Sequence, residues 1–158
     1  MKAKEIYQRI KSIPSIDTFT FESIKTLLGV VGDLKDFTVL EIGSAHGRSA
    51  MAWKLAGAKE VITVDIQDAL SQEVENRVTF VHGDSLTIPW DRKVDIVFID
   101  GDHSYEGCLG DLRKYMPFAT KVICGHDYSD NFPSVKRAVD DFFGKLSLNK
   151  DDWFIVKK

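Results

Sequence analysis

The sequence predicts an α/β sandwich built around a mostly parallel sheet. Short runs rich in β-branched residues alternate with segments of helical periodicity, and several of the runs are nearly continuous in apolar residues. Strands buried on both faces of a parallel sheet have this composition. The chain has 158 residues, 44% of them hydrophobic, which suits one domain. We therefore expect a single domain over residues 1–158, with leading helices in residues 1–34 and the core in residues 35–158.

Two helices are expected before the first strand. The first, over residues 5–13, has isoleucines at helical spacing and is expected to end before Pro14, because proline cannot continue a helix. The second is expected to begin after a cap at Thr20 and to end at Gly32, since glycine is common just past helix ends. Its apolar side chains share one face, formed by Phe21, Ile24, Leu27, Leu28 and Val31.

Strands and helices then alternate to the end of the chain. The strands are expected over residues 37–42, 60–65, 77–82, 94–99, 120–124 and 153–156. The helices are expected over residues 48–56, 69–75, 105–116 and 134–146. Residues 85–92 have no clear periodicity, so they are expected to be irregular.

The charge balance and the cysteines narrow the classes of partner. With 21 Lys and Arg against 24 Asp and Glu, the chain has no general attraction to nucleic acid or anionic lipid. No apolar run approaches the ~20 residues of a membrane span, and the N-terminal residues lack a signal-peptide core. Cys108 and Cys124 fall in segments expected to be buried, which favours reduced thiols. We expect a cytoplasmic protein with a small or specific partner, and neither a nucleic acid nor a membrane.

Polar residues follow each of the five expected parallel strands, at the edge where open parallel sheets bind ligands. Gly43 and Gly47 allow a sharp turn beside the N-terminus of the next helix, which favours an anion. Asp65 ends the second strand, where it suits the hydroxyl pair of a ribose. Together these residues favour a nucleoside ligand. NAD is disfavoured, because Ala45 and Arg48 stand where a dinucleotide loop needs its second and third glycines.

These strand ends resemble those of the class I S-adenosylmethionine-dependent methyltransferases. The resemblance covers residues 37–143, and it is closest to the subgroup of macrolide-sugar and related small-molecule O-methyltransferases. It implies a Rossmann-like three-layer sandwich. The matching positions are Glu41-x-Gly43-x-x-x-Gly47, Asp65, Gly83-Asp84-Ser85, Asp100, Ile99-Asp-Gly-Asp-His-Ser-Tyr-Glu106, Asp111-Leu112, Gly125-His-Asp-Tyr128 and residues 135–142.

The resemblance implies S-adenosylmethionine as the cofactor and a small-molecule hydroxyl group as the methyl acceptor. The residues implied at the cofactor are Glu41 at the base of the glycine loop, Gly43, Ser44, Ala45 and Gly47 around the methionine part, Asp65 at the ribose, Asp84 and Ser85 at the adenine, and Asp100 beside the methyl group.

Two ways of activating the acceptor hydroxyl remain open. In metal-using members of the superfamily, the position of Asp100 and two polar residues after the fifth strand hold a divalent cation such as Mg²⁺. Here those two residues are His126 and Asp127, and the imidazole departs from the oxygen ligands that Mg²⁺ prefers. Alternatively, His103 is the general base, because imidazole titrates near neutral pH. We favour His103 as the base, with Asp100 as the second catalytic residue, slightly over a purely metal-dependent mechanism.

The end of the chain departs from the family pattern. Methyltransferases of this class have seven strands and a final antiparallel hairpin, whereas a single expected strand, residues 153–156, follows the last helix here. The sheet is therefore expected to be truncated at this edge, and an exposed edge invites a second copy to form a homodimer. Two other function classes stay open. One is a non-catalytic nucleoside-binding or partner-regulating module, and the other, disfavoured, is an NAD-linked oxidoreductase.

Overall fold

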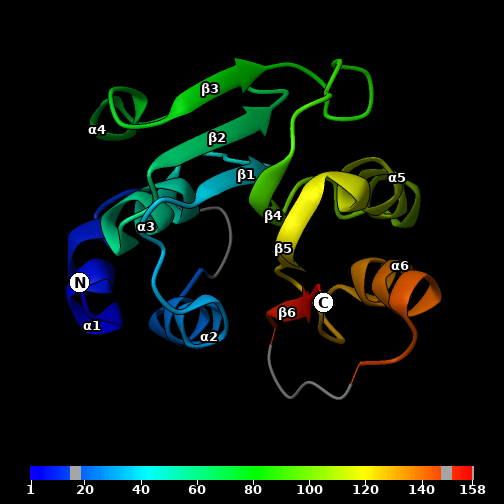
Figure 1. The fold of residues 1–158 in the computed structure, drawn as a ribbon. Coiled ribbons are helices and arrows are strands. Elements are labelled where there is room, and N and C mark those ends of the chain that lie inside the picture. The colour runs from blue at the N-terminus through cyan, green and yellow to red at the C-terminus, as the bar shows by residue number, and fades with distance from the viewer. Residues whose placement is uncertain (15–18, 147–150, 158) are drawn as a thin grey trace.

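A six-stranded sheet forms the centre of the protein (Figure 1). The computed structural model describes residues 1–14, 19–146 and 151–157. The strand order is β3-β2-β1-β4-β5-β6, with β1 to β5 parallel and β6 antiparallel to β5. The strands are β1 (Thr38–Ile42), β2 (Glu60–Asp65), β3 (Thr79–His82), β4 (Val94–Ile99), β5 (Ala119–Gly125) and β6 (Trp153–Val156). The predicted sandwich with a mostly parallel sheet is confirmed.

Helices cover both faces of the sheet and complete the three layers (Figure 1). One face carries α1 (Ala3–Ile10), α2 (Phe21–Val31) and α3 (Arg48–Ala56), and the other carries α5 (Tyr105–Tyr115) and α6 (Pro133–Phe143). The short α4 (Gln72–Glu75) precedes β3, and a 3₁₀ turn, η1 (Met116–Phe118), follows α5. Each face has its own hydrophobic cluster. Ile6 and Ile10 of α1 belong to the same cluster as Val39 and Trp53, so the leading helices share the core of the sheet.

The helix ends follow the local signals in the sequence. The hydroxyl of Thr20 accepts a hydrogen bond from the backbone N–H of Ser23, and Gly32 stands at the end of α2 with a φ of 69°. The first helix ends at Ile10, three residues earlier than expected, because the ring of Pro14 would clash with the Ile10 carbonyl in a continued helix. Residues 85–92 contain neither helix nor strand, as expected.

One strand follows α6 in the described part of the chain, so the expected truncation of the sheet is confirmed. This strand, β6, pairs with β5 through the register from Val122 opposite Val156 to Gly125 opposite Trp153. The indole of Trp153 is fully buried, whereas Val156 is 58% exposed at the edge. The single strand is therefore anchored by one large aromatic side chain.

Hydrogen bonds carry the sheet one residue beyond the strands, at the edge where the polar residues lie. The N–H of Gly43 donates to Val64 O at 2.8 Å, and the N–H of Asp100 donates to Ile42 O at 2.8 Å. The N–H of Gly83 likewise donates to the carbonyl of Asp65 at 2.9 Å. These bonds fix the loops after β1, β3 and β4 relative to one another, which gives the site a rigid base.

Candidate functional site

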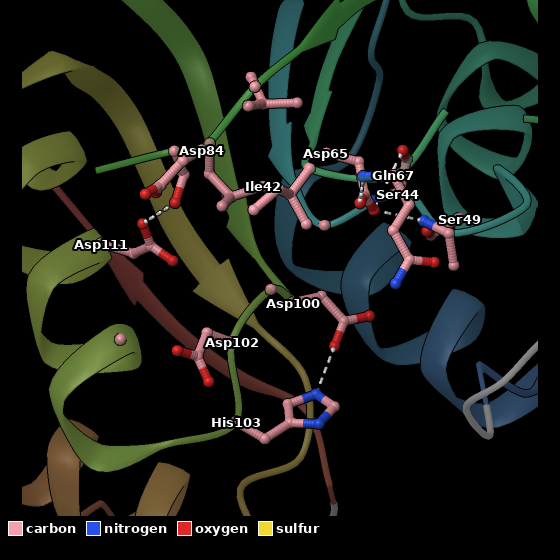
Figure 2. A pocket seen from close by; sticks show the side chains of 18 of the residues that line it. Ile42, Ser44, Ser49, Asp65, Gln67, Asp84, Asp100, Asp102, His103 and Asp111 are labelled. Atoms are coloured by element: carbon pink, nitrogen blue, oxygen red, sulfur yellow. Dashed lines mark hydrogen bonds and ion pairs between the residues drawn. The ribbon is translucent and has the colours of Figure 1, made fainter. Parts of the chain in front are cut away.

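A pocket of about 500 Å³ opens at the carboxyl ends of the parallel strands (Figure 2). Most of the residues expected to contact a cofactor line it, and so does His103. Four of the expected site residues lie outside the lining, namely Glu41, Gly47, His126 and Asp127. The lining residues that were expected are Gly43, Ser44, Ala45, Asp65, Asp84, Ser85, Asp100 and His103.

The two glycines of the loop after β1 are required by contacts within the protein. Both have a φ of 86°, in the left-handed region that favours glycine. A Cβ on Gly43 would lie 2.0 Å from the carbonyl oxygen of Asp100, and one on Gly47 would lie 2.7 Å from Cγ1 of Val74. The loop therefore packs against β4 and α4 and leaves its other side open to the pocket.

Asp65 holds the glycine loop in place. Its Oδ2 accepts hydrogen bonds from the backbone N–H groups of Ser44, at 2.9 Å, and Ala45, at 2.8 Å. Its Oδ1 accepts from the N–H of Gln67 at 2.8 Å. Oδ2 already accepts two N–H groups, but Oδ1 keeps a second lone pair, so Asp65 can support the loop and still accept a hydroxyl of a ribose.

Glu41 lies beneath the same loop, fully buried. Burial raises the pKa of Glu41 to about 8, although the neighbouring hydroxyls of Ser49 and Thr63 lower it in part. Its place below the pocket fits the expected role of supporting the loop and excludes direct contact with a ligand in this arrangement.

Asp111, on α5, contacts the segment that follows β3, and the sequence predicted no role for it. Ser85 donates from its hydroxyl to Oδ1 of Asp111, at 2.6 Å, and Asp84 accepts from the N–H of Leu86 with its Oδ1, at 2.8 Å. Asp111 is 1% exposed and lines the pocket from α5. The sequence does contain a signal for Asp111. This aspartate lies between Cys108 and Leu112 on a helix face expected to be buried, and a buried aspartate is rare unless it has a partner.

His103 lies between two buried carboxylates at the other end of the pocket. Its Nε2 is 2.9 Å from Oδ2 of Asp127 and 3.8 Å from Oδ1 of Asp100. The side chains of Asp100 and Asp127 are 7% and 2% exposed. Asp127 has a φ of 60°, an uncommon conformation for a residue other than glycine, and it turns the carboxylate toward His103.

The charges of this trio oppose the expected role of His103 as a base. Interactions with Asp100 and Asp127 raise the pKa of His103 to about 10, against a smaller lowering by burial. Burial raises the pKa of Asp127, but the two histidines beside it outweigh this and lower it to about 2. At neutral pH His103 is therefore a protonated imidazolium, which has no free lone pair to accept a proton.

His126 does not reach the pocket. Its ring is 1% exposed, its Nδ1 lies 3.0 Å from Oδ1 of Asp127, and its Nε2 lies 4.0 Å from Asp152. Burial lowers the pKa of His126, but the surrounding carboxylates of Asp127, Asp100 and Asp152 raise it to about 9. The expected metal trio of Asp100, His126 and Asp127 is thus corrected. The ligand atoms that gather within 4.8 Å of one another are those of Asp100, His103 and Asp127.

A model of a methyltransferase domain matches residues 40–128 of the chain, from β1 to the loop after β5. These residues include the glycine loop, Asp65, the wall after β3 and the trio around His103. The chain belongs to this methyltransferase-domain family. The resemblance to class I S-adenosylmethionine-dependent methyltransferases is confirmed.

One curated relative of this methyltransferase domain is an uncharacterized protein of Acanthamoeba polyphaga mimivirus. The two are 28% identical, and the match covers 73% of this chain and 63% of the relative. The chain therefore spans less than two thirds of the length of the viral protein.

Solved structures of other methyltransferases share the fold. A candidate RNA methyltransferase from Pyrococcus horikoshii has a TM-score of 0.66 at 20% identity, over 90% of this chain and 78% of that one. An O-methyltransferase from Bacillus cereus in complex with S-adenosylhomocysteine has a TM-score of 0.65 at 18% identity, over 99% and 90%. The MycE methyltransferase of mycinamycin biosynthesis, in complex with Mg, S-adenosylhomocysteine and mycinamycin VI, has a TM-score of 0.62 at 20% identity, over 84% and 39%.

None of the helices in the described part of this methyltransferase domain has the length and apolarity that crossing a membrane requires.

Proposed function

We propose that the protein transfers the methyl group of S-adenosylmethionine to a hydroxyl group of a small molecule. The observation that carries this proposal is the continuity of one pocket, which extends from Asp65 at one end to Asp100 and His103 at the other. Asp65 suits the ribose of the cofactor, and the far end places charged groups where the acceptor would meet the methyl group. The Bacillus cereus O-methyltransferase and MycE, both complexes with S-adenosylhomocysteine, support the same assignment.

The charge of the pocket favours a small acceptor over a nucleic acid. Among the described residues that line the pocket, Arg48 is the one Lys or Arg, and its guanidinium donates to the carbonyl of Ile13. Five aspartates also line the pocket. A nucleic acid would bring phosphates against these carboxylates without the basic residues that normally neutralise them. The aspartates are Asp65, Asp84, Asp100, Asp102 and Asp111.

The trio of Asp100, His103 and Asp127 fits a divalent cation. Nε2 of His103 and Oδ2 of Asp127 are 2.9 Å apart, yet they are not aligned as hydrogen-bond donor and acceptor. Two ligand atoms of one ion have this relation. Two carboxylates and one imidazole suit a transition-metal ion such as Mn²⁺, as well as Mg²⁺ that keeps several waters. When bound there, the cation would displace the proton of the His103 imidazolium, since only a neutral imidazole binds a metal, and it would lower the pKa of the acceptor hydroxyl.

The residues of the chain would then act mainly by placing the two reactants. The glycine loop and Asp65 hold the cofactor, and Asp100 borders the space where the acceptor oxygen approaches the methyl carbon. The O–C bond forms as the C–S bond breaks, its electron pair stays on sulfur, and S-adenosylhomocysteine is released. The hydroxyl proton passes to water beside His103, whose side chain is 34% exposed. In-line alignment is the main contribution that such a site makes to the rate.

Calorimetric titration with S-adenosylhomocysteine, with NAD as the comparison ligand, tests the cofactor. Micromolar binding of S-adenosylhomocysteine alone is the expected result, and absence of binding would refute the proposal. Methyl-labelled S-adenosylmethionine, incubated with a panel of phenols and sugars with and without Mn²⁺ or Mg²⁺, tests the acceptor. Cofactor binding without transfer to any member of the panel would favour the non-catalytic nucleoside-binding module instead.

A further inference from the structure

The pairing of β5 with β6 fixes His126 in the interior. The register that sets Gly125 opposite Trp153 places the next residues, His126 and Asp152, opposite each other. Nε2 of His126 lies 4.0 Å from Oδ1 of Asp152, and the two side chains are 1% and 3% exposed. Opposite residues of antiparallel strands have their side chains on the same face of the sheet, so this contact follows from the register. Asp152 thus provides a buried counter-charge on one side of the ring.

The other side of the His126 ring faces Asp127. Nδ1 of His126 is 3.0 Å from Oδ1 of Asp127, whereas Nε2 of His103 lies 2.9 Å from the second oxygen, Oδ2. Each histidine therefore contacts a different oxygen of the same carboxylate. His103 lines the pocket and His126 does not, so the two rings approach Asp127 from the pocket and from the interior.

Packing holds the His126 ring away from the pocket. The ring of Phe19, which lines the pocket, packs against it with the two ring centroids 6.2 Å apart. The N–H of Tyr128 donates to the carbonyl of Asp151 at 2.8 Å, which ties the backbone just after Asp127 to the segment before β6. His126 is also outside the group of described residues whose ligand atoms gather within 4.8 Å of one another. It is therefore placed to act on a bound cation only through Asp127.

We propose that His126 is a positioning residue for the divalent cation, which holds Oδ1 of Asp127 and leaves Oδ2 to bind the ion. This inference rests on the proposed function and on the cation site formed by Asp100, His103 and Asp127. A carboxylate with one oxygen held by the protein presents the other oxygen to the metal in a fixed direction. Replacement of a group that orients a metal ligand in this way typically lowers the metal affinity roughly 10- to 100-fold.

The sign of the change in metal affinity separates this role from two others. A positive charge on His126 repels a nearby cation, so removal of the charge alone would tighten metal binding. Loss of the contact that orients Asp127 would weaken metal binding. A side chain that only fills the core would change the stability of the protein and leave the metal affinity as it was.

The test replaces His126 with two amides that keep different parts of the ring. In His126→Asn, the amide nitrogen takes the place of Nδ1 and can still donate to Oδ1 of Asp127. In His126→Gln, the amide nitrogen reaches the place of Nε2, beside Asp152, and leaves Oδ1 of Asp127 without this donor. Both variants lose the ring and its charge, so each is the matched control of the other.

Calorimetric titration with Mn²⁺ alone measures the affinity of each variant, after urea denaturation has shown that it is folded. We expect His126→Gln to bind Mn²⁺ at least about tenfold more weakly than the wild type, and His126→Asn to bind within about threefold of it. Equal or tighter binding by His126→Gln would overturn the inference. Equal losses in the two variants would overturn it as well, because the missing ring and not the contact with Oδ1 would then be responsible.

A measurement on the wild-type protein covers the case in which neither variant folds. Nitrogen NMR of the protein with ¹⁵N-labelled histidine, with its four rings assigned, shows which imidazoles bind Zn²⁺, a diamagnetic probe of the same site. We expect a metal-bound nitrogen in His103 and none in His126. Direct binding of Zn²⁺ by His126 would make this residue a ligand and overturn the inference.

Failure of the inference and failure of the proposed function can be told apart. A wild-type protein that binds neither S-adenosylhomocysteine nor Mn²⁺ would refute the proposed function, and the inference would fall with it. Binding of S-adenosylhomocysteine without Mn²⁺ would leave the cofactor pocket intact and refute both the cation site and the role of His126. Binding of both by the wild type, with unchanged Mn²⁺ affinity in His126→Gln, would refute the inference alone.

Discussion

Gly43 and Asp100 meet so closely that a Cβ on the glycine would lie 2.0 Å from the aspartate carbonyl oxygen. This contact joins the ends of β1 and β4, the two central strands of the sheet. The N–H of Asp100 also donates to the carbonyl of Ile42, so the two strand ends have little freedom to separate. A side chain at position 43 would displace Asp100 from the wall of the pocket.

Gly43→Ala is therefore expected to damage both the fold and the site. The clash with backbone and the φ of 86° should together lower the free energy of unfolding by at least about 3 kcal/mol. Urea denaturation measures this loss, and calorimetry should show weaker binding of S-adenosylhomocysteine. Gly57→Ala is the matched control, because Gly57 has a φ of 112° with open space around it and should lose only about 1 kcal/mol. Equal losses in the two variants would contradict the close-contact argument.

Asp65→Ala is expected to weaken binding of S-adenosylhomocysteine by about 1.5 to 3 kcal/mol, or roughly 10- to 150-fold. The variant would lose the acceptor for the ribose hydroxyls and also the hydrogen bonds that hold Ser44 and Ala45. Calorimetric titration measures the change. Asp68→Ala, an exposed aspartate outside the pocket, should bind as the wild type does. Unchanged affinity in Asp65→Ala would remove Asp65 from the cofactor site.

Glu41 gives a prediction for the effect of pH on stability. Its folded-state pKa of about 8 lies above the ordinary value of 4.5, so the folded protein keeps a proton that the unfolded chain releases. Stability from this group is therefore present below about pH 4.5 and is lost as the pH rises toward 8. Glu41→Gln cannot ionise. Its free energy of unfolding, relative to wild type, should be higher at pH 9 than at pH 5 by at least about 1 kcal/mol.

Urea denaturation at the two pH values gives this difference, and Glu60→Gln is the comparison. Arg92 lowers the pKa of Glu60 below its ordinary value, mainly through a hydrogen bond to the carboxylate. Glu60 is therefore already ionised at pH 5 in the folded protein. Its replacement should shift stability similarly at both pH values. If Glu41→Gln behaved in the same way, Glu41 would be ionised within the fold and the prediction would be wrong.

The order of strands and helices could be predicted from the sequence because each element depends mainly on local pattern. Thr20 and Gly32 mark the ends of α2 as expected, and polar residues after β1, β2, β3 and β4 do meet at one pocket. These features need only periodicity, capping and the rule that parallel strands end at one edge.

The directions of individual side chains could not be predicted in the same way. His126 directly follows β5, but its ring points into the interior between Asp127 and Asp152. His103, from the loop after β4, is the histidine that lines the pocket beside Asp127. Which of the two histidines faces the pocket depends on the left-handed backbone at Asp127 and on the packing around β6, and no local sequence pattern reveals either. Asp111 was missed as a lining residue for a related reason, because its hydrogen bond joins it to Ser85, 26 residues earlier.

The trio of Asp100, His103 and Asp127 predicts that the wild type binds Mn²⁺. We expect Asp127→Asn or His103→Ala to weaken this binding at least tenfold. His103→Ala removes one of three ligands, Asp127→Asn replaces a charged ligand by a neutral amide oxygen, and calorimetry with Mn²⁺ alone measures the loss. Asp102→Asn is the charge-matched control, because Asp102 lines the same pocket but directs both oxygens to Ser104. His103→Ala should bind S-adenosylhomocysteine within about threefold of wild type while methyl transfer falls much further. An equal loss of Mn²⁺ binding in Asp102→Asn would point to general charge attraction, and no binding by the wild type would leave His103 as an imidazolium paired with Asp100 and Asp127.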